Sequence, residues 1–384
     1  MTPRVSLVSS SAATCYGGAE TYVLNAARVL SADCEVHLVS GKGAPTDDLK
    51  RLLAASGVVL HGLPFIPRRS AFSRSFIRGP LRAKVNEFDV EALSFLWPPW
   101  RIKKALEGSD VVEVNYAAES LIFPLLDKGV RKIIHFHGPW LPRVYAHLRG
   151  WVNKSVNLMI TCSRWSKGEI EKVLGGKAHV EVIYNGVDTD VFCPSDVRNA
   201  AMDEVSDPAL PRIGTVGRLG PDKGTDLLIE VARTMQGKAE FFAAGPLDGS
   251  LAQIIEREGA PPNFHLLEPM PNRKLPGFYN SIDCFVLPTL FEAFSITLVE
   301  AMASGKAVVA SRTGGIPEVV EHNKQGILVE PKDGAALRKA IDTVIGSRSL
   351  MSDMGEAGRA RVVEKFSVER MGREIRQLFL QGGQ

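Results

Sequence analysis

The chain of 384 residues has few cysteines, no long apolar run and little net charge. Its five cysteines show no C-x-x-C spacing, and their odd number favours reduced thiols over a disulfide framework or a structural zinc site. No apolar stretch approaches the roughly 18 to 20 residues that a membrane-spanning helix needs. The net charge is +3, and we expect no nucleic-acid partner. These features predict a cytoplasmic protein.

The positive charge is concentrated in one segment, residues 67–84, which contains six basic residues. Four apolar residues are interleaved with them, namely Phe72, Phe76, Ile77 and Leu81. A basic amphipathic element of this kind can lie on an anionic membrane surface, which would make the protein peripheral on the inner face of the membrane. It can equally be a solvated helix whose apolar residues face the core. Both interpretations stay open.

The chain also lacks a dinucleotide-binding fingerprint, because no G-x-G-x-x-G follows its first predicted strand, residues 4–9. Only Gly17 and Gly18 stand before the first predicted helix. A glycine pair there lets backbone amides approach an anion at the positive end of a helix. A loose turn that tolerates glycine is the alternative.

Apolar periodicity switches repeatedly between strand and helix in both halves of the chain. The predicted strands are residues 4–9, 35–41, 109–115, 131–138 and 156–163, then 212–219, 239–245, 283–289 and 306–311. The predicted helices are residues 19–30, 224–235, 250–259, 295–304 and 316–322. Such alternation predicts parallel sheets with right-handed crossovers.

Two α/β domains, each a doubly wound Rossmann-like sheet, are therefore expected, with a ligand cleft between them. The periodicity is lost around residues 186–210. We place the N-terminal domain at 1–186 and the C-terminal domain at 187–366. The last helix, about 367–384, is expected to pack back on the first domain.

One predicted helix carries a glutamate on its apolar stripe. Ser295 is a suitable N-cap, and Glu300 shares a face with Ile296, Val299 and Ala303. A buried, unpaired carboxylate costs several kcal/mol, so Glu300 needs a hydrogen-bonding partner. The partner is either a neighbouring Arg or Lys, or a polar ligand at the start of the helix.

Two cations, Arg218 and Lys223, lie in a glycine-rich loop between a predicted strand and helix. Arg as a planar fork and Lys as a point charge suit a diphosphate at the carboxyl end of a strand. Surface cations in loops are more often simply solvated, but the flanking glycines free the backbone for a close approach.

His135 and His137 stand at strand spacing and share one face. A metal site is disfavoured because H-x-H has no evident third ligand. Core histidines or, for His137, a polar contact to a ligand are the alternatives. The D-x-D pair Asp188 and Asp190 falls in the connector between the domains, and we interpret it as turn chemistry.

Several motifs together are specific, although each alone is weak. "VIYNGVDTDVF", "TVGRLGPDKGTDLLIEVA", "FEAFSITLVEAMASGKAVVASRTGGIPEVV" and "GILVEPKDGAAL" follow one another in this order. In this order and spacing they resemble the family-four retaining glycosyltransferases of the GT-B fold. The resemblance covers residues 180–335 well, and in the N-terminal half only "YGGAE" and "HFHG" correspond.

The resemblance implies a role for each candidate residue. Glu292 and Glu300 fit the E-x7-E motif of that family, in which the first faces the donor sugar and the second accepts hydrogen bonds from ribose hydroxyls. Arg218 and Lys223 match the cations that bind the donor diphosphate and stabilise charge on the departing phosphate.

The remaining matches concern backbone amides and one histidine. The amides around Ser295 and Ile296 would add helix dipole at the phosphate. Gly18, with Gly17 before it, matches the glycine that approaches the phosphate or acceptor. His137 matches the histidine that contacts the sugar near the reacting carbon.

By resemblance the enzyme transfers a sugar from a nucleotide-diphosphate sugar to a hydroxyl with retention of configuration, without a metal or another cofactor. UDP is favoured over GDP because it is commoner in the family. The acceptor is a glycan, a lipid-linked molecule or a small molecule. Ala293, Ser295 and Glu268 depart from the glycines usual there.

Other functions are alternatives for this chain. A catalytically inactive sugar-nucleotide-binding protein and a GT-B nucleotide-sugar epimerase are the nearest. A nicotinamide oxidoreductase is disfavoured by the missing fingerprint, and a phosphorylase of the glycogen type by the lack of a motif for its lysine.

Overall fold

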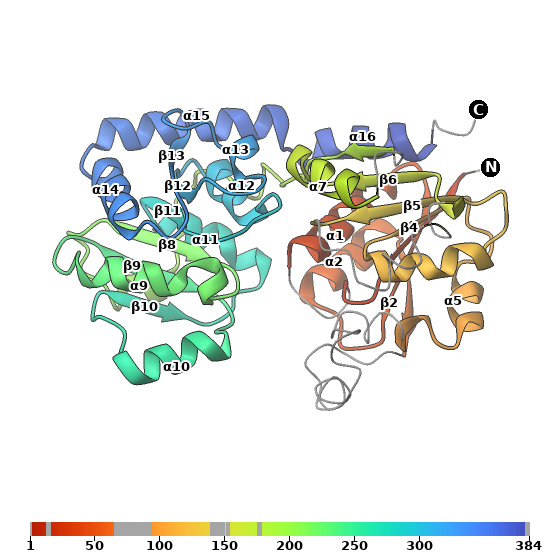
Figure 1. Cartoon of the computed structure of the whole chain (residues 1–384), viewed down its shortest axis with the longest axis horizontal. Helices are drawn as coiled ribbons and strands as arrows, with labels where there is room; N and C mark the ends of the chain where they lie inside the picture. Colours follow the sequence, from red (N-terminus) through yellow and green to blue (C-terminus); the bar gives the residue numbers. More distant parts are fainter. Residues whose placement is uncertain are drawn as a thin grey trace. The chain divides into compact units, whose positions relative to one another are not determined.

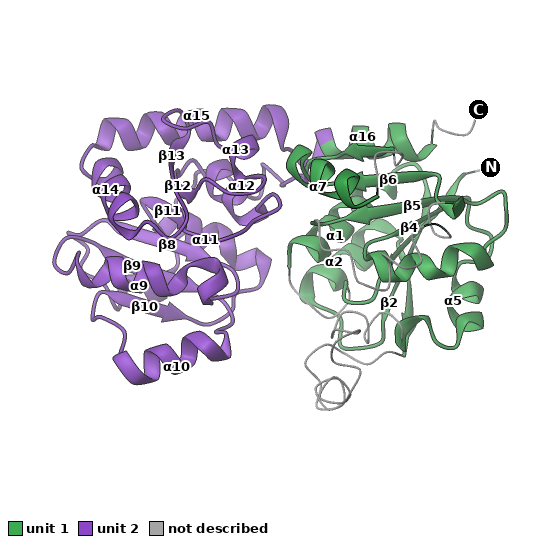
Figure 2. Cartoon of the chain, in the orientation of Figure 1, with its two compact units in different colours: residues 1–184, 371–384 green, residues 185–370 purple. Residues whose placement is uncertain are grey.

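The computed structural model describes residues 2–12, 17–64, 94–138, 150, 154–174 and 179–380. The chain forms two compact units, shown in Figure 2. Unit 1 comprises residues 1–184 and 371–384, and unit 2 comprises residues 185–370. The basic segment 67–84, on which the membrane interpretation depends, lies outside the described residues.

Unit 1 is built on a seven-stranded parallel sheet with the order β3-β2-β1-β4-β5-β6-β7. Its strands are β1 (Arg4–Ser9), β2 (Glu35–Gly41), β3 (Val59–Leu63), β4 (Val111–Val114), β5 (Arg131–Phe136), β6 (Leu158–Thr161) and β7 (Val180–Val182). All four residues of β4 and of β6 are buried, which indicates a sheet covered on both faces, although Glu113 and Thr161 are polar.

The helices of unit 1 connect these strands (Figure 1). They are α1 (Gly18–Leu30), α2 (Asp47–Ser56), α5 (Pro99–Ala105), the 3-10 helix η2 (Ala117–Leu125), α7 (Arg164–Leu174) and the C-terminal α16 (Val368–Leu380). Helix α2 shows why the sequence starts a helix where it does. The side chain of its N-cap, Thr46, accepts a hydrogen bond from the Leu49 amide, and Gly57 ends the helix in the left-handed conformation.

Helix α16 packs in unit 1 although it lies at the far end of the chain. The Arg376 side chain donates to the Val29 carbonyl, and its Nε lies 2.6 Å from Asp33 Oδ2. Arg131 donates to the Leu378 carbonyl at 2.9 Å. At Gly372, an added Cβ would meet Val29 Cβ at 3.0 Å, so glycine allows the close approach of α16 to α1.

Unit 2 is a second parallel sheet, with six strands in the order β10-β9-β8-β11-β12-β13. Its strands are β8 (Arg212–Val216), β9 (Glu240–Ala244), β10 (Phe264–Leu267), β11 (Cys284–Leu287), β12 (Ala307–Ser311) and β13 (Gly326–Val329). Its core contains Phe241, Val286 and Val309, all fully buried. This sheet and that of unit 1 are both doubly wound.

The helices of unit 2 vary in length (Figure 1). They are α8 (Ala200–Asp203), η3 (Pro221–Lys223), α9 (Thr225–Arg233), α10 (Gly249–Glu258), η4 (Asn272–Lys274), α11 (Leu275–Ser281), α12 (Ile296–Ala303), α13 (Ile316–Val319), α14 (Gly334–Ile345) and α15 (Arg348–Lys365). Pro317 lies in the first turn of α13, where its missing N–H has no cost.

All nine strands and five helices expected from periodicity are present, so the α/β, doubly wound class is confirmed. Four strands were not predicted: β3, β7, β10 and β13. Each is a short strand of three to five residues, and periodicity gives too little signal over such a length.

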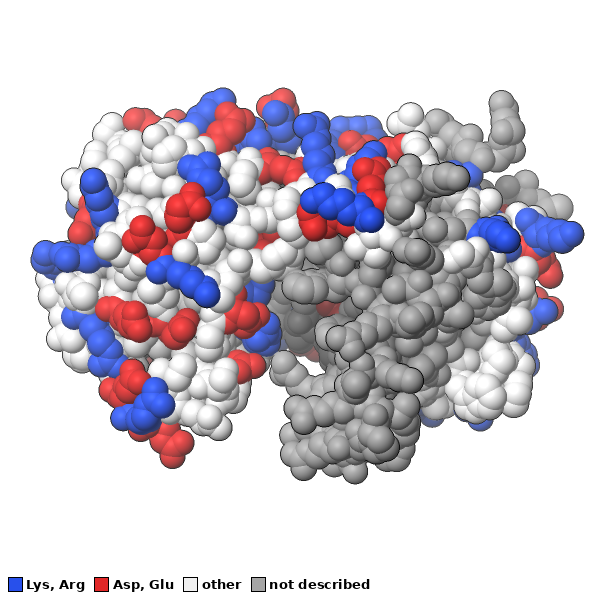
Figure 3. Space-filling model, in the orientation of Figure 1, with Lys and Arg blue, Asp and Glu red and all other residues white. Residues whose placement is uncertain are grey.

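The surface of unit 2 carries charge of both signs. Figure 3 shows acidic and basic side chains interspersed over its visible face rather than separated into fields. Among the described residues, no helix is long and apolar enough to cross a membrane.

Candidate functional site

The strand orders place one candidate region in each unit. In open α/β sheets ligands bind outside the carboxyl ends of strands, at the point where the strand order reverses. In unit 2 the order reverses between β8 and β11. The loop after β8 carries Arg218 and Lys223, and the loop after β11 carries Glu292. In unit 1 the order reverses between β1 and β4.

The structure brings Lys223 and Glu292 together across 69 residues of sequence. Lys223 Nζ donates to Glu292 Oε2 at 2.6 Å, and both side chains are mostly buried. Backbone packing holds Glu292 in place, because the Gly315 amide donates to its carbonyl at 2.9 Å. Gly314 has a φ of +54°, and a Cβ there would lie 1.9 Å from the same carbonyl oxygen. Only glycine fits at this position.

Arg218 is paired with carboxylates that the sequence analysis did not single out. Its guanidinium donates two hydrogen bonds to Asp222, and its Nη1 lies 3.6 Å from Asp248 Oδ2. Both candidate cations are thus neutralised by neighbouring acids. A diphosphate binding here would compete with Asp222 for Arg218 and with Glu292 for Lys223. The i, i+4 spacing of Arg218 and Asp222 was the only signal in the sequence.

Glu300 is buried as predicted, with 3% of its surface exposed. Its partner is neither a cation nor part of the sequence prediction: the Tyr279 hydroxyl donates to Glu300 Oε2 at 2.8 Å. Burial raises the pKa of Glu300 to about 8, although the Tyr279 hydrogen bond lowers it. Burial and the nearby Glu300 raise the pKa of Tyr279 well above its usual value. The carboxyl is therefore largely protonated at neutral pH.

Ser295 caps α12, as expected. Its hydroxyl accepts a hydrogen bond from the Leu298 amide at 3.3 Å. Its φ is +76°, in the region that favours glycine. A strained non-glycine residue is thus held at the start of the helix that carries Glu300. Ile296, the first helical residue, is buried beside it.

In unit 1, Gly17 and Gly18 lie where α1 begins, and both are exposed. Gly17 is the N-cap, with an extended backbone and no side-chain cap. Glu20 lies in the first turn, where it accepts hydrogen bonds from the Ser11 hydroxyl at 2.5 Å and the Tyr116 hydroxyl at 2.9 Å. The contact of these backbone amides with an anion stays a prediction.

A buried polar cluster surrounds His137. The rings of His135 and His137 stack with centroids 4.1 Å apart, and Tyr22 packs edge-on against both. Glu113 accepts a hydrogen bond from Tyr22 at 2.9 Å and shares one with His135 Nδ1, which lies 3.3 Å from its Oε1. Burial raises the pKa of Glu113 to about 8 and lowers that of His135 to about 3. Both groups are neutral at pH 7, so they form a neutral hydrogen bond rather than an ion pair.

Asn115 determines the tautomer of His137. Its side-chain amide donates to the Val8 carbonyl at 3.1 Å, which turns its oxygen toward His137 Nε2 at 2.8 Å. That nitrogen must therefore carry the proton, and Nδ1 is a bare acceptor. His137 Nδ1 is buried and has no hydrogen-bond partner among the described residues. Burial lowers the pKa of His137 well below its usual value. Its Nδ1 can accept a hydrogen bond from a hydroxyl.

The Glu119 side chain links the carboxyl ends of two neighbouring strands, β1 and β4. Its carboxylate accepts from the backbone amides of Ser10 at 2.8 Å and of Asn115 and Tyr116 at 3.2 Å each. Burial raises its pKa to about 8 against the effect of these bonds. Glu119 thereby holds the carboxyl ends of β1 and β4 in register.

The D-x-D pair forms a turn, as expected. Asp188 Oδ1 accepts from the amides of Asp190 and Val191, at 3.1 and 3.2 Å. Among the residues that the structure describes, no group of three or more His, Cys, Asp and Glu side chains is placed to hold a metal ion.

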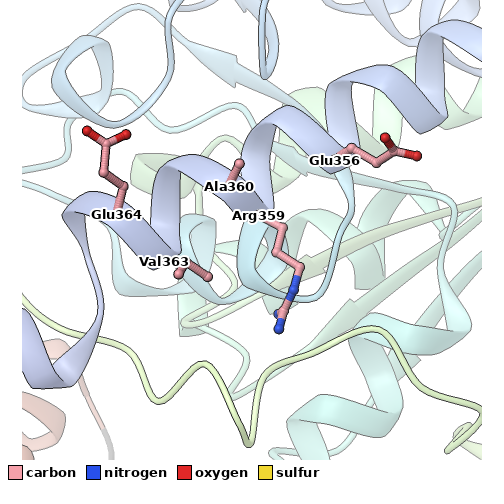
Figure 4. Close-up of a pocket in the computed structure, with 5 residues that line it drawn as sticks. All are labelled: Glu356, Arg359, Ala360, Val363 and Glu364. Atoms are coloured by element: carbon pink, nitrogen blue, oxygen red, sulfur yellow. The ribbon is translucent and has the colours of Figure 1, made fainter.

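A separate hollow lies along α15 and contains none of the candidate residues. It is lined by Glu356, Arg359, Ala360, Val363 and Glu364 (Figure 4). Arg359 donates to the carbonyls of Thr189, Phe192 and Ala303, so its guanidinium is committed to tying the connector to the helix.

Two family models match adjacent parts of the chain. Residues 16–191 match Glycosyltransferase Family 4, and residues 201–361 match Glycosyl transferases group 1. The chain belongs to the family-four glycosyltransferases. Many curated and solved glycosyltransferases are similar to it.

Among relatives, the GDP-mannose-dependent alpha-(1-6)-phosphatidylinositol monomannoside mannosyltransferase of Mycolicibacterium smegmatis is 28% identical, over 72% of this chain and 78% of its own. An uncharacterised glycosyltransferase of Methanocaldococcus jannaschii is 23% identical over 94% of each chain. The D-inositol 3-phosphate glycosyltransferase of Mycobacterium marinum is 28% identical over 52% of this chain, which spans 44% of that relative.

Solved structures agree on the GT-B fold. Anabaena HepE in complex with UDP-glucose superimposes with a TM-score of 0.79 at 20% identity, covering 98% of each chain. Sucrose-phosphate synthase from Thermosynechococcus elongatus gives 0.79 at 18% identity, covering 99% of this chain and 98% of the other. The glycosyltransferase described here thus has the two-domain fold that the sequence predicted.

Proposed function

We propose that this glycosyltransferase moves a sugar from a nucleotide-diphosphate sugar to an acceptor hydroxyl, with retention of configuration and without a metal ion. Donor binding is assigned to unit 2 and acceptor binding to unit 1. Two observations in unit 2 carry the proposal: the pairing of buried Glu300 with Tyr279, and the pairing of Lys223 with Glu292.

Each group in unit 2 receives one role. Glu300 accepts hydrogen bonds from the ribose hydroxyls, and Tyr279 orients its carboxyl. Arg218 and Lys223 bind the diphosphate, which takes the place of the carboxylates that pair with them in the free protein. Glu292, released from Lys223, faces hydroxyls of the sugar. The amides of Ser295 and Ile296 add positive charge at the start of α12.

Charge stabilisation accounts for the chemistry in this proposal. The bond between the anomeric carbon and the phosphate oxygen breaks, and the diphosphate departs with added negative charge. Two side-chain cations fixed in advance stabilise that charge by several kcal/mol. The departing phosphate takes the proton of the acceptor hydroxyl on the face from which the acceptor attacks. No side-chain nucleophile is assigned.

Unit 1 contributes Gly17, Gly18 and His137 to contacts with the phosphate, the reacting sugar and the acceptor. The bare Nδ1 of His137 supports this role, because it is a buried acceptor that matches a sugar hydroxyl.

For the nucleotide base of the donor we propose a preference, and for the acceptor a chemical class. UDP is favoured over GDP, with support from the UDP-glucose complex of HepE, whereas the mycobacterial mannosyltransferase is named for GDP-mannose. That relative acts on a phosphatidylinositol mannoside, which supports a lipid-linked or glycan acceptor over a small molecule.

Calorimetric titration with UDP, GDP and ADP in excess EDTA tests the donor site. We expect one nucleotide to bind, and to lose affinity by at least about tenfold in Glu300→Ala and in Arg218→Ala/Lys223→Ala. The double variant Lys238→Ala/Arg257→Ala removes the same charge from exposed positions of unit 2 and serves as the control. Unchanged affinity in both site variants would refute the assignment.

A further inference from the structure

Three carboxylates lie around the two candidate cations of unit 2. Asp222 accepts two hydrogen bonds from the Arg218 guanidinium, one of them at 2.9 Å, and Asp248 Oδ2 lies 3.6 Å from Arg218 Nη1. Glu292 Oε2 pairs with Lys223 Nζ at 2.6 Å. Two positive side chains thus face three negative ones, which gives the group a net formal charge of −1. A diphosphate is also an anion, so it must compete with these carboxylates for the cations.

The backbone holds Asp222 in a fixed position beside Arg218. The Asp222 carbonyl accepts a hydrogen bond from the Leu290 amide at 2.9 Å, which ties the loop after β8 to the loop after β11. A Cβ at Gly220 would lie 3.0 Å from Asp222 Oδ1 and 3.1 Å from Asp248 Cβ, so glycine leaves the room in which both acids approach Arg218. Because the backbone is tied in this way, rotation of side chains is enough to release Arg218.

Stability accounts poorly for the contact between Arg218 and Asp222. Their side chains are 36% and 53% exposed, and ion pairs at this exposure contribute little to the free energy of unfolding. The two parallel hydrogen bonds, however, have the geometry with which a guanidinium holds a phosphate. In the free protein Asp222 therefore occupies the N–H groups that a phosphate would use.

From these contacts we infer that Asp222 is an internal competitor of the nucleotide: its carboxylate lowers the affinity for the nucleotide diphosphate and speeds its release after sugar transfer. The inference rests on the proposed function, in which Arg218 binds the diphosphate. Asp248 adds a second, weaker competitor next to the same guanidinium. As the contacts to the departing diphosphate break, Asp222 takes its place at Arg218, and the enzyme is not trapped by its product.

Calorimetric titration of the full chain with UDP, GDP and ADP, followed by stopped-flow displacement of the nucleotide that binds, tests the inference. Asp222→Asn keeps the shape of the side chain and one acceptor oxygen for Arg218, but it removes the charge. We expect this variant to bind the nucleotide at least about threefold more tightly than the wild type and to release it more slowly by a similar factor. A gain of affinity of this kind cannot result from misfolding.

Asp248→Asn tests the second carboxylate. Asparagine is as good an N-cap as aspartate, so the start of α10 should be preserved. We expect a smaller gain of affinity than in Asp222→Asn, because the distance from Asp248 to Arg218 is longer than a hydrogen bond.

Two comparisons separate competition at Arg218 from a general effect of charge. In an Arg218→Ala background, Asp222→Asn should raise the affinity clearly less than in the wild type, because the carboxylate no longer has this cation to occupy. Asp353→Asn removes the same charge from an exposed position on α15 and should leave the affinity unchanged. An equal gain with and without Arg218 would overturn the inference.

The inference and the proposed function can fail separately. Unchanged or weaker binding in Asp222→Asn, together with a loss of affinity in Arg218→Ala/Lys223→Ala, would overturn the inference and leave the donor site in place. So would binding that requires Mg²⁺ and is lost in Asp222→Asn, because the carboxylate would then hold the metal. Wild-type affinity in Arg218→Ala/Lys223→Ala would refute the donor site itself, and the inference with it.

Discussion

Replacing Glu300 by glutamine separates the effect of the buried carboxyl on the free energy of unfolding from its role in nucleotide binding. The pKa of Glu300 is about 8 in the folded protein because of burial, and 4.5 in the unfolded chain. Between these values the folded state binds the proton and the unfolded state does not, so the free energy of unfolding falls as pH rises. Below pH 4.5 both states are protonated, and this destabilisation is absent.

The magnitude follows from the two pKa values. Integrating the proton linkage from pH 5 to pH 7 gives a loss of about 2 to 3 kcal/mol in the wild type, which does not occur in the Glu300→Gln variant. The packing cost of the amide is the same at both pH values and cancels in the comparison. Glu113 and Glu119 titrate in both proteins and cancel as well.

Urea unfolding of both proteins at pH 5 and pH 7 measures this difference. Relative to the wild type, the variant should gain about 2 to 3 kcal/mol of stability between the two pH values. At pH 7 it should also bind nucleotide at least about tenfold more weakly, because the amide has one acceptor oxygen where the carboxyl has two for the ribose hydroxyls. Glu256→Gln, at an exposed position on α10, is the control and should show the same change at both pH values. A pH-independent difference for Glu300→Gln would refute the reasoning that burial keeps this carboxyl protonated.

Three further predictions concern the positive φ of Ser295, the backbone hydrogen bonds to Glu119 and the tautomer of His137. Ser295→Gly should change the free energy of unfolding by only a few tenths of a kcal/mol, because relief of the positive φ offsets the lost N-cap. Ser295→Ala loses the cap and keeps the positive φ, so thermal unfolding should show it about 1 to 2 kcal/mol less stable than Ser295→Gly. Glu119→Ala should destabilise unit 1 by about 2 to 3 kcal/mol in urea, because the Ser10 and Tyr116 amides lose their acceptor, whereas the Asn115 amide keeps the Val8 carbonyl. Exposed Glu107→Ala should change little. Nitrogen chemical shifts should show that His137 is neutral, with its proton on Nε2, from pH 8 down to pH 5, because burial lowers its pKa. The Asn115→Asp substitution should raise the pKa of His137. A charged His137 ring in the wild type at pH 6 would contradict the assignment.

Local patterns in the sequence predicted nine strands, the helices that follow several of them and one buried group. The stripe at Ile296, Val299 and Ala303 predicted that Glu300 is buried, because helical spacing alone determines which side chains share a face. The alternation of strands and helices predicted two doubly wound sheets for the same reason. The motifs then predicted the family that the comparisons show.

The partners were decided only by the tertiary structure. Tyr279 meets Glu300 across 21 residues, Lys223 meets Glu292 across 69, and Tyr22 meets Glu113 across 91. Periodicity shows which face of an element is buried, but it carries no information about the group that lies opposite. That depends on the strand order, which places β8 beside β11 and β1 beside β4. The pKa values of the buried carboxyls follow from the same packing, because desolvation depends on everything that surrounds a group in three dimensions.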